Sequence, residues 1–220
     1  MSEHYFAPKP AAKPKRRQIE AELRGRHFRF FTEAGVFSPE RVDPGTRLLA
    51  ETMEVGEADV ALDLGCGYGV LGIAAAALAS RGRVYLVEIN ERAARLAREN
   101  LALNRISNAE VREGDGLGPV AGLEFDVIAF NPPLRAGNRV VHSLIAQAAR
   151  ALRPGGRFYL VARTRQGAKT LARKLAEIFG RVSEVEKGGG YRVYLCRRSD
   201  ATRSPQAGEL GSCEGRPALG

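Results

Sequence analysis

Residues 128–137, IAFNPPLRAG, place an asparagine and two prolines directly after a run of apolar residues. The side-chain carbonyl of Asn131 and the backbone carbonyl of Pro132 can each accept one hydrogen of a planar amino group. Such a nitrogen is a poor nucleophile because its lone pair is delocalised, and two acceptors would hold it in line with an electrophile. Proline has a fixed φ and no N–H, so Pro132 and Pro133 give the asparagine a stiff frame. Activation of an unreactive nitrogen is the role that the family resemblance given below implies for this stretch, and a proline-terminated edge strand is the alternative.

Residues 62–72, LDLGCGYGVLG, form a second stretch with chemical potential. An apolar strand runs into Asp63, three alternate glycines follow, and a helical pattern begins. Glycines let the backbone turn sharply and approach a ligand closely, and a helix N-terminus offers unpaired N–H groups. The stretch therefore predicts a nucleotide-type ligand at the carboxyl edge of a sheet.

The type of ligand depends on Asp63, Glu88 and Asp115, which each stand at or near the end of a strand-like run. GYGVLG also fits the dinucleotide fingerprint GxGxxG, and Glu88 lies 21 residues after Gly67. Asp63 would repel a pyrophosphate, whereas it would attract the ammonium and sulfonium groups of S-adenosylmethionine. Glu88 suits the ribose diol of that cofactor, and Asp115 suits its adenine amine. We therefore expect S-adenosylmethionine; a nicotinamide cofactor is the alternative, and helix or turn capping is the purely structural role for these carboxylates.

Strand-like and helical runs alternate through the middle of the chain and must position these residues. Strand-like runs lie at 60–64, 84–88, 109–113, 126–130, 158–162, 181–185 and 191–195. Helical runs lie at 69–80, 91–104, 142–153 and 166–180. The pattern predicts an α/β fold, a Rossmann-like doubly wound sheet of seven mostly parallel strands. EKGGG, at residues 186–190, is too short for a crossover, so the last two strands should form an antiparallel hairpin.

A small N-terminal unit precedes this alternation. Residues 18–30 alternate apolar and polar side chains on both sides of RGR, which predicts a β-hairpin. Asp43 is expected to cap a following helix, with Pro44 at its first position. The expected organisation is a basic extended arm (1–17), one domain (18–198, with hairpin and helix at 18–55 and the core at 56–198) and a disordered tail (199–220).

Composition limits the class of protein. At 220 residues and 44% hydrophobic content, the chain can bury one good core. The N-terminus lacks the apolar centre of a secretion signal, and no run of about 18 apolar residues occurs, so we expect a cytoplasmic protein without a membrane partner. Three widely spaced cysteines fit neither a disulfide framework nor a zinc knuckle, and we expect no metal.

The net charge of +9 is unevenly distributed along the chain. Residues 1–30 carry 8 Lys/Arg against 3 Asp/Glu, residues 134–199 carry 15 against 3, and residues 31–133 carry 9 against 16. A polyanionic partner such as RNA explains the two basic blocks, since Lys and Arg make the phosphate contacts that supply much of the affinity. Solvated basic helix faces are the alternative explanation.

These motifs resemble those of a known family. DLGCGYG, the acidic end of the second core strand and NPPL after the fourth resemble the class I S-adenosylmethionine-dependent methyltransferases, in the branch with an NPP motif that methylates planar nitrogens. The resemblance extends to the small-subunit ribosomal RNA guanine-N2 methyltransferase group (methyltransferase small domain) and its archaeal relatives. It is carried there by HYF at 4–6, GVFS at 35–38, DPGTRLL at 43–49, NPPLRAG at 131–137 and GGYRVY at 189–194.

The resemblance implies methyl transfer to an exocyclic amino nitrogen, first of all guanine N2 in ribosomal RNA. N5-methylation of a protein glutamine and methylation of a guanine in transfer RNA are alternatives within the class. A nicotinamide-dependent oxidoreductase and a non-catalytic RNA-binding protein are alternatives outside it. Leu134 departs from the group, in which an aromatic residue usually follows the prolines and would stack on the target base. The chain is expected to act as a monomer or homodimer.

The sequence thus predicts three sets of site residues. The catalytic set is Asn131, Pro132, Pro133 and Leu134. The cofactor-binding set is Asp63, Gly65, Cys66, Gly67, Gly69, Glu88, Ile89, Asp115, Gly116 and Asn131. The substrate-binding set is Phe37, as a lid or as core, together with Arg135 and Arg139, as phosphate contacts or as solvated surface. Tyr5, Phe6, Phe28 or Phe30 could supply aromatic platforms for RNA, although hairpin packing explains Phe28 and Phe30 as well. His142 is expected to be an ordinary helix residue.

Overall fold

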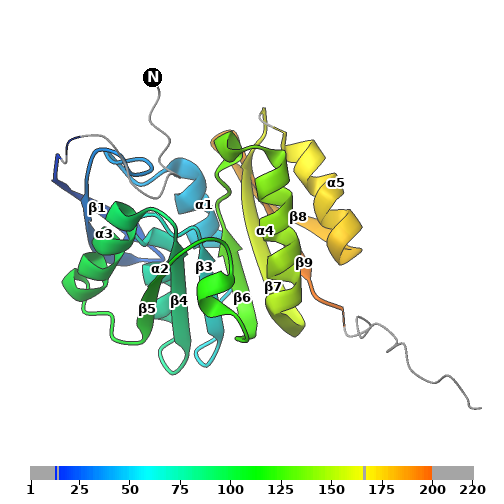
Figure 1. Ribbon diagram of the computed structural model, residues 1–220, viewed down its shortest axis with the longest axis horizontal. Coiled ribbons are helices and arrows are strands. Elements are labelled where there is room, and N and C mark those ends of the chain that lie inside the picture. The colour runs from blue at the N-terminus through cyan, green and yellow to red at the C-terminus, as the bar shows by residue number, and fades with distance from the viewer. Residues whose placement is uncertain (1–12, 14, 166, 200–220) are drawn as a thin grey trace, which may run out of the picture.

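A computed structural model describes residues 13, 15–165 and 167–199 of the chain (Figure 1). Most of the expected N-terminal arm, with Tyr5 and Phe6, lies outside the described residues, and so does nearly all of the expected tail. The described part contains a two-stranded hairpin and a seven-stranded sheet flanked by helices. No helix in this part is both long enough and apolar enough to cross a membrane.

The large sheet has the strand order β5-β4-β3-β6-β7-β9-β8. The first five strands in this order are paired in parallel. β9 is antiparallel to both β7 and β8, so it alone runs against the other six. Their bounds are β3 Val60–Leu64, β4 Arg83–Glu88, β5 Ala109–Glu113, β6 Phe125–Phe130, β7 Leu152–Arg163, β8 Val182–Gly188 and β9 Tyr191–Arg197. The structure thus confirms the expected α/β class, the mostly parallel sheet and the antiparallel C-terminal hairpin.

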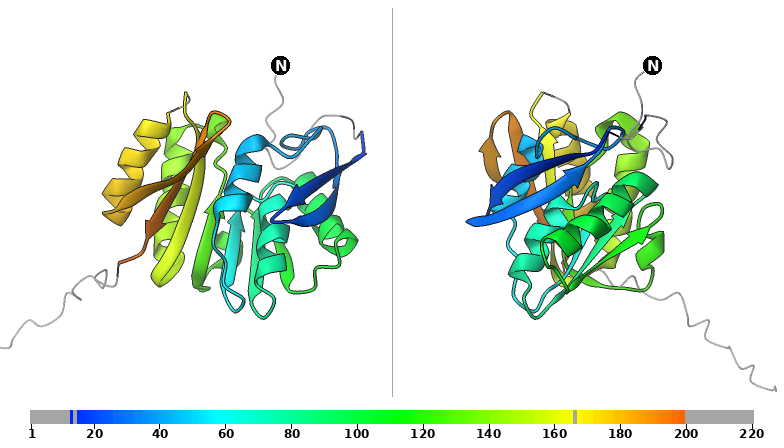
Figure 2. Two further views of the ribbon diagram at one scale, coloured as in Figure 1. Left: turned by 180° about the vertical axis from the view of Figure 1, so that it is seen from behind. Right: turned by 90° about the vertical axis from the view of Figure 1, so that its left-hand side faces the viewer.

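Helices cover both faces of this sheet, as the alternation of strands and helices requires (Figures 1 and 2). The helices are α1 Pro44–Thr52, α2 Val70–Leu78, α3 Glu91–Leu103, α4 Asn138–Ala151 and α5 Ala168–Phe179, with short 3-10 turns η1 Gly118–Val120 and η2 Leu134–Ala136. Side chains of α1, α2 and α3 belong to one buried apolar cluster, and those of α4 and α5 belong to a second. The two clusters are the two layers of the core.

The boundary between α4 and β7 differs from the expected one. The sequence pattern placed a helix over 142–153, whereas α4 begins at Asn138 and ends at Ala151, and Leu152 already belongs to β7. Pro154 explains the early end, because a proline pushes the residue before it, here Arg153, out of the helical region. The early start brings Val140 to the mouth of the cavity described below.

The N-terminal hairpin, β1 Arg17–Leu23 and β2 Arg26–Thr32, pairs in the expected antiparallel register and packs against α3. The buried carboxamide of Asn100 fixes this contact: it accepts a hydrogen bond from Phe31 N (2.7 Å) and donates to Phe31 O (3.0 Å) and Tyr68 O (2.9 Å). Phe28 and Phe30 are 6% and 0% exposed. The expectation that they stack on RNA is therefore wrong, because both rings are buried in the packing of the hairpin.

Helix α1 ends the N-terminal unit and starts as the sequence predicts. Asp43 caps it by accepting a hydrogen bond from Thr46 N at 3.0 Å, and Pro44 occupies the first helical position. This N-terminus lies at the carboxyl edge of the sheet, next to the end of β6 and the start of β9. Buried side chains of the hairpin, α1 and the sheet form one continuous cluster, while the division at residue 56 stays a prediction.

Candidate active site

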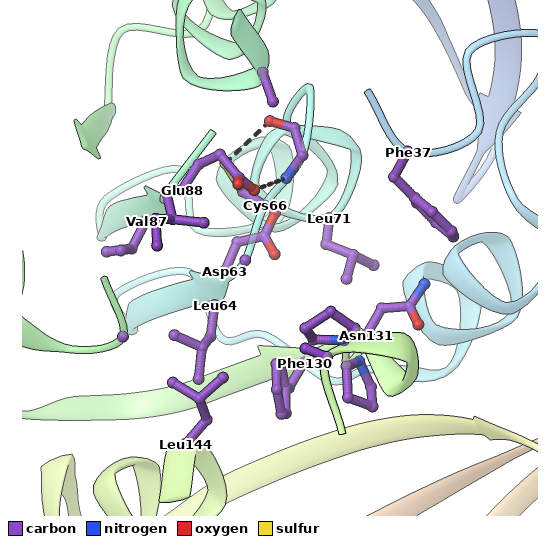
Figure 3. Close-up of a pocket in the computed structure, with 18 of the residues that line it drawn as sticks. Phe37, Asp63, Leu64, Cys66, Leu71, Val87, Glu88, Phe130, Asn131 and Leu144 are labelled. Carbon is purple, nitrogen blue, oxygen red and sulfur yellow. Dashed lines mark hydrogen bonds between the residues drawn. The ribbon is translucent and has the colours of Figure 1, made fainter. Parts of the chain in front are cut away.

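A cavity of about 340 Å³ opens at the carboxyl edge of the parallel strands. Figure 3 shows Asp63, Cys66 and Glu88 on one side of it and Asn131 and Phe37 on the other. We call these sides the cofactor half, formed by the ends of β3, β4 and β5, and the acceptor half, formed by the end of β6 and the start of α1.

Most of the predicted site residues line this cavity. From the cofactor-binding and catalytic sets, the lining contains Asp63, Gly65, Cys66, Gly67, Glu88, Ile89, Asp115, Gly116, Asn131, Pro132 and Pro133. Gly69 and Leu134 are not part of it. The structure therefore brings together residues from the ends of four strands that the sequence could place only one at a time.

The glycine loop between β3 and α2 depends on left-handed backbone conformations. Gly65 and Gly67 have φ values of +69° and +56°, which residues with a Cβ adopt only at a cost. The N–H groups of Gly65 and Cys66 both donate to the carbonyl of Val87, at 2.9 and 3.0 Å. Gly69 instead ends the loop with φ +97° and packs against Ala97 of α3, so it shapes the loop without facing the cavity.

Asp63 is the most deeply buried carboxylate of the site, with 2% exposure. Its Oδ2 accepts a hydrogen bond from Gly72 N in the first turn of α2 at 2.7 Å, whereas its buried Oδ1 has no hydrogen-bond partner among the residues that the structure describes. Burial raises the pKa of Asp63 to about 7, and the nearby Glu88 carboxylate adds to the rise. The group thus caps a helix, as the structural reading allowed, and keeps one oxygen that a cationic ligand would satisfy.

Glu88 organises the backbone around it. Its Oε2 accepts from Gly67 N at 2.7 Å and its Oε1 accepts from Asn90 N at 2.9 Å, so one carboxylate ties the glycine loop to the start of α3. Burial raises the pKa of Glu88 as well. Each oxygen has a second lone pair, so a ligand diol can still donate to it. This backbone role is the helix or turn capping that the sequence left open as the structural alternative.

Asp115 and Cys66 line the same half with different environments. Asp115 is exposed, and its side chain has no hydrogen bond or ion pair in the described part of the chain, so it does not cap a turn. Cys66 is buried, and desolvation followed by the charge of Asp63 raises the pKa of its thiol well above the usual range. A thiol of this kind is inert, as a small side chain in the loop should be.

The acceptor half is built around the half-buried Asn131 at the end of β6. Its Nδ2 donates to Thr46 Oγ1 of α1 at 2.8 Å. Pro132 O, the second expected acceptor, already accepts from Leu134 N at 2.9 Å and keeps one lone pair. The carboxamide is therefore held by its amino end, and its carbonyl end remains for a ligand.

The sequence missed the residues that surround Asn131. Thr46 and Asp43 line the cavity, and Tyr191, at the start of β9, donates its hydroxyl to Asp43 Oδ1 at 3.1 Å. A Cβ on Gly45 would lie 2.5 Å from the Tyr191 ring, so glycine is required there. Asp43 was expected only as a helix cap, and for Thr46 and Tyr191 the signal was that DPGTRLL and GGYRVY belong to the family resemblance, which assigned them no role.

The predicted substrate-binding residues are placed differently from one another. Phe37 is half-buried and lines the cavity, together with Val140, which is 42% exposed. Arg139 is exposed in the first turn of α4, outside the lining, and the side chain of Arg135 lies outside what the structure describes.

Leu134 needs a correction. It was predicted as a catalytic residue, but it lies outside the cavity lining: it is partly buried in η2 and packs against the apolar cluster beneath α4. The 3-10 turn after Pro133 directs it there. His142 lies outside the lining on α4, as expected of a helix residue, and its buried Nε2 makes no hydrogen bond within the described ranges. No group of three or more His, Cys, Asp or Glu residues in the described ranges is arranged to hold a metal.

Comparison with known proteins gives consistent matches. A family model described as methyltransferase small domain matches residues 27–195. The chain is 36% identical to the uncharacterized Bacillus subtilis protein YbxB over 200 residues, which is 90% of this chain and 100% of that protein. It is 34% identical to ribosomal RNA small subunit methyltransferase C of Pseudomonas fluorescens over 168 residues, 74% of this chain and 49% of that protein.

A solved structure agrees with these matches. The T. thermophilus 16S rRNA N2 methyltransferase RsmC, in complex with AdoMet and guanosine, aligns with a TM-score of 0.74 at 28% identity, over 83% of this chain and 50% of that one. The chain thus spans all of YbxB but about half the length of the two ribosomal RNA methyltransferases named here.

Proposed function

This chain belongs to the methyltransferase small domain family, and we propose that it transfers a methyl group from S-adenosylmethionine to the N2 amino group of a guanine in ribosomal RNA. One observation carries the proposal: Asn131, held by Thr46 through its amino end, lines the same cavity as the buried, half-satisfied carboxylate of Asp63. The Asn131 amide suits an amine that donates hydrogen bonds, and the Asp63 carboxylate suits a cation.

The cofactor half fits S-adenosylmethionine by its chemistry. The unpartnered Oδ1 of Asp63 is a buried acceptor with a raised pKa, and a cationic ligand would offset the cost of its ionised form. Glu88 and the exposed Asp115 supply acceptors for hydroxyl and amino donors. When bound, the cofactor supplies an electrophilic methyl group.

The acceptor half would prepare the amino nitrogen. Asn131 Oδ1 and the remaining lone pair of Pro132 O accept the two amine hydrogens and hold the nitrogen lone pair in line with the methyl group. As positive charge develops on the nitrogen, both acceptors bind its hydrogens more strongly, which lowers the barrier. The methylated nitrogen is then acidic enough to lose one proton to water, so this chain needs no strong base.

Charge at the cavity rim supports a polyanionic substrate. On the acceptor side, exposed cations have no carboxylate partner in the described part of the chain: Arg139, Arg163, Arg165 and Lys169. On the cofactor side, by contrast, Arg92 and Arg95 pair with Glu33, and Arg98 pairs with Glu113. Cations without a carboxylate partner at this edge of the sheet suit the phosphates that flank a target guanine. The relatives named as ribosomal RNA methyltransferases point to the same substrate class.

Methyl transfer from labelled cofactor tests the proposal. Purified protein is incubated with S-adenosylmethionine labelled in its methyl group and with either ribosomal RNA from cells lacking the gene or a protein release factor. The expected result is label in RNA, recovered as N2-methylguanosine by nucleoside mass spectrometry. Label in protein alone would replace the RNA substrate with a glutamine amide, and no transfer to either would remove the proposal.

A further inference from the structure

We infer that Thr46 is a positioning residue for Asn131: its hydroxyl fixes the carboxamide with the amino end toward α1 and the carbonyl oxygen toward the acceptor. The inference rests on the proposed function, because it concerns how the acceptor amine is gripped. Asn131 was expected from the sequence, whereas Thr46, 85 residues away, joins the site only in the folded chain.

The orientation of a carboxamide is not decided by packing. The oxygen and amino ends have nearly the same size, so a neighbour must select one by hydrogen bonding. Asn131 Nδ2 donates to Thr46 Oγ1 at 2.8 Å, and Thr46 is only 8% exposed, so water competes little for this contact. With the opposite orientation, Asn131 would present N–H donors to an amine that is itself a donor, and two donors repel.

A hydroxyl can donate as well as accept, so Thr46 alone could hold either end of the amide, and Asp43 decides between them. Its Oδ2 accepts from Thr46 N at 3.0 Å, which places a carboxylate beside the threonine that holds Asn131. A negative charge there attracts the positive amino end of the amide dipole and repels the carbonyl end. The carbonyl oxygen is therefore left for the cavity.

A third chain segment holds Thr46 and Asp43 in place. The Tyr191 hydroxyl donates to Asp43 Oδ1 at 3.1 Å, and its ring fills the space that a side chain on Gly45 would occupy. Burial and the Asp43 carboxylate both raise the pKa of Tyr191, so the hydroxyl stays a donor at neutral pH. The segments DPGT, NPP and GGY thus meet at one point, which gives a physical role to the motifs DPGTRLL and GGYRVY.

Thr46→Val tests the inference, because valine keeps the shape of threonine and removes its hydroxyl. Thr46→Ser restores a hydroxyl. Thr52→Val is the matched control: it makes the same change on the same helix, where the Thr52 hydroxyl donates to Leu48 O at 2.7 Å outside the cavity lining. For each variant, turnover and KM are measured with ribosomal RNA, and cofactor affinity is measured by calorimetry.

Thr46→Val is expected to lower kcat roughly 10- to 100-fold, because a poorly aligned acceptor loses much of the benefit of orientation. Its KM for RNA and its cofactor affinity should match those of the wild type. Thr46→Ser should recover most of the loss, and Thr52→Val should retain full turnover. A Thr46→Val enzyme with wild-type kcat would overturn the inference, and so would equal losses in Thr46→Val and Thr52→Val.

Nuclear magnetic resonance supplies a readout that needs no activity. The side-chain amide signals of Asn131 are identified by their disappearance in Asn131→Ala. Their hydrogen exchange should be slowed in the wild type and in Thr46→Ser, and fast in Thr46→Val. If the wild type methylates neither RNA nor protein, the proposed function fails while this measurement still decides the positioning role. Unchanged exchange in Thr46→Val would remove that role whatever the activity.

Discussion

The two halves of the cavity are held together in different ways. The cofactor half uses carboxylates that bind backbone N–H groups nearby in the chain: Asp63 contacts Gly72, and Glu88 contacts Gly67. The acceptor half uses polar side chains that meet across 85 residues, from Thr46 to Asn131, and across 148, from Asp43 to Tyr191, and the group it offers to the acceptor is the neutral amide of Asn131. The difference suits a cation in one half and a neutral amine in the other.

This comparison also assigns separate tasks to the two halves. A buried carboxylate with a raised pKa stores an electrostatic cost that a cationic ligand relieves, so the cofactor half should control affinity. A neutral amide held in one orientation does little for ground-state binding and acts when charge develops on the substrate, so the acceptor half should control turnover. Substitutions in the two halves should therefore affect different kinetic constants.

The largest effect is expected from Asn131→Ala. It removes an acceptor that acts on the developing charge, and kcat should fall roughly 100- to 1,000-fold. Cofactor affinity, measured by calorimetry, should stay within about twofold, since the substitution lies in the acceptor half. The division between the halves would be wrong if the dissociation constant rose as steeply as kcat fell.

Asp63→Asn makes the matching change in the cofactor half. The amide oxygen can still accept from Gly72 N, but the negative charge is lost, so cofactor affinity should weaken roughly 10- to 100-fold. Single-turnover rates at saturating cofactor should change much less. Equal affinity in Asp63→Asn and wild type would show that the charge of Asp63 does not contribute to binding.

The third prediction concerns pH and follows from the pKa of Asp63, about 7 in the ligand-free protein. Below that pH the carboxyl is protonated, so cofactor affinity should fall about tenfold between pH 8 and pH 6. Calorimetry in buffers of different ionisation enthalpy should detect proton release on binding near pH 6.5. Asp63→Asn should abolish both effects, and a pH-independent wild type would contradict the account.

The same shift has a consequence for stability with the opposite sign from a salt-bridged aspartate. Between pH 3.8, the usual value, and about pH 7, the folded cofactor-free protein holds a proton that the unfolded chain has lost. The contribution of Asp63 to the free energy of unfolding therefore decreases as pH rises through this window. Thermal unfolding of wild type and Asp63→Asn across these pH values would reveal the difference.

The smallest effect is expected at the rim. Arg165→Glu reverses an exposed charge beside the acceptor half and should raise the KM for RNA roughly three- to tenfold, with kcat unchanged. Arg197→Glu is the control, because Arg197 is exposed at the opposite edge of the sheet. The effect should shrink at high salt. Equal KM values in the two variants would leave the basic rim without a role in RNA binding.

The sequence predicts features whose residues are contiguous in the chain better than features whose residues lie far apart. The strands, the glycine loop and the end of β6 could be predicted because their patterns are contiguous. Thr46 and Tyr191 could not be assigned, because nothing local shows that residues so far apart will meet. Leu134 was misplaced since the turn η2, which directs it into the apolar cluster, leaves no periodic pattern. Phe28 and Phe30 were open to two readings until packing against α3 decided between them.

The most direct test of the central claim is the structure of a complex with S-adenosylhomocysteine and guanosine. The account predicts Asn131 Oδ1 within roughly 3 Å of the guanine amino nitrogen, with Nδ2 still on Thr46 and Asp63 on the amino group of the cofactor product. A guanine bound away from Asn131, or a carboxamide that turns its amino end to the base, would contradict it.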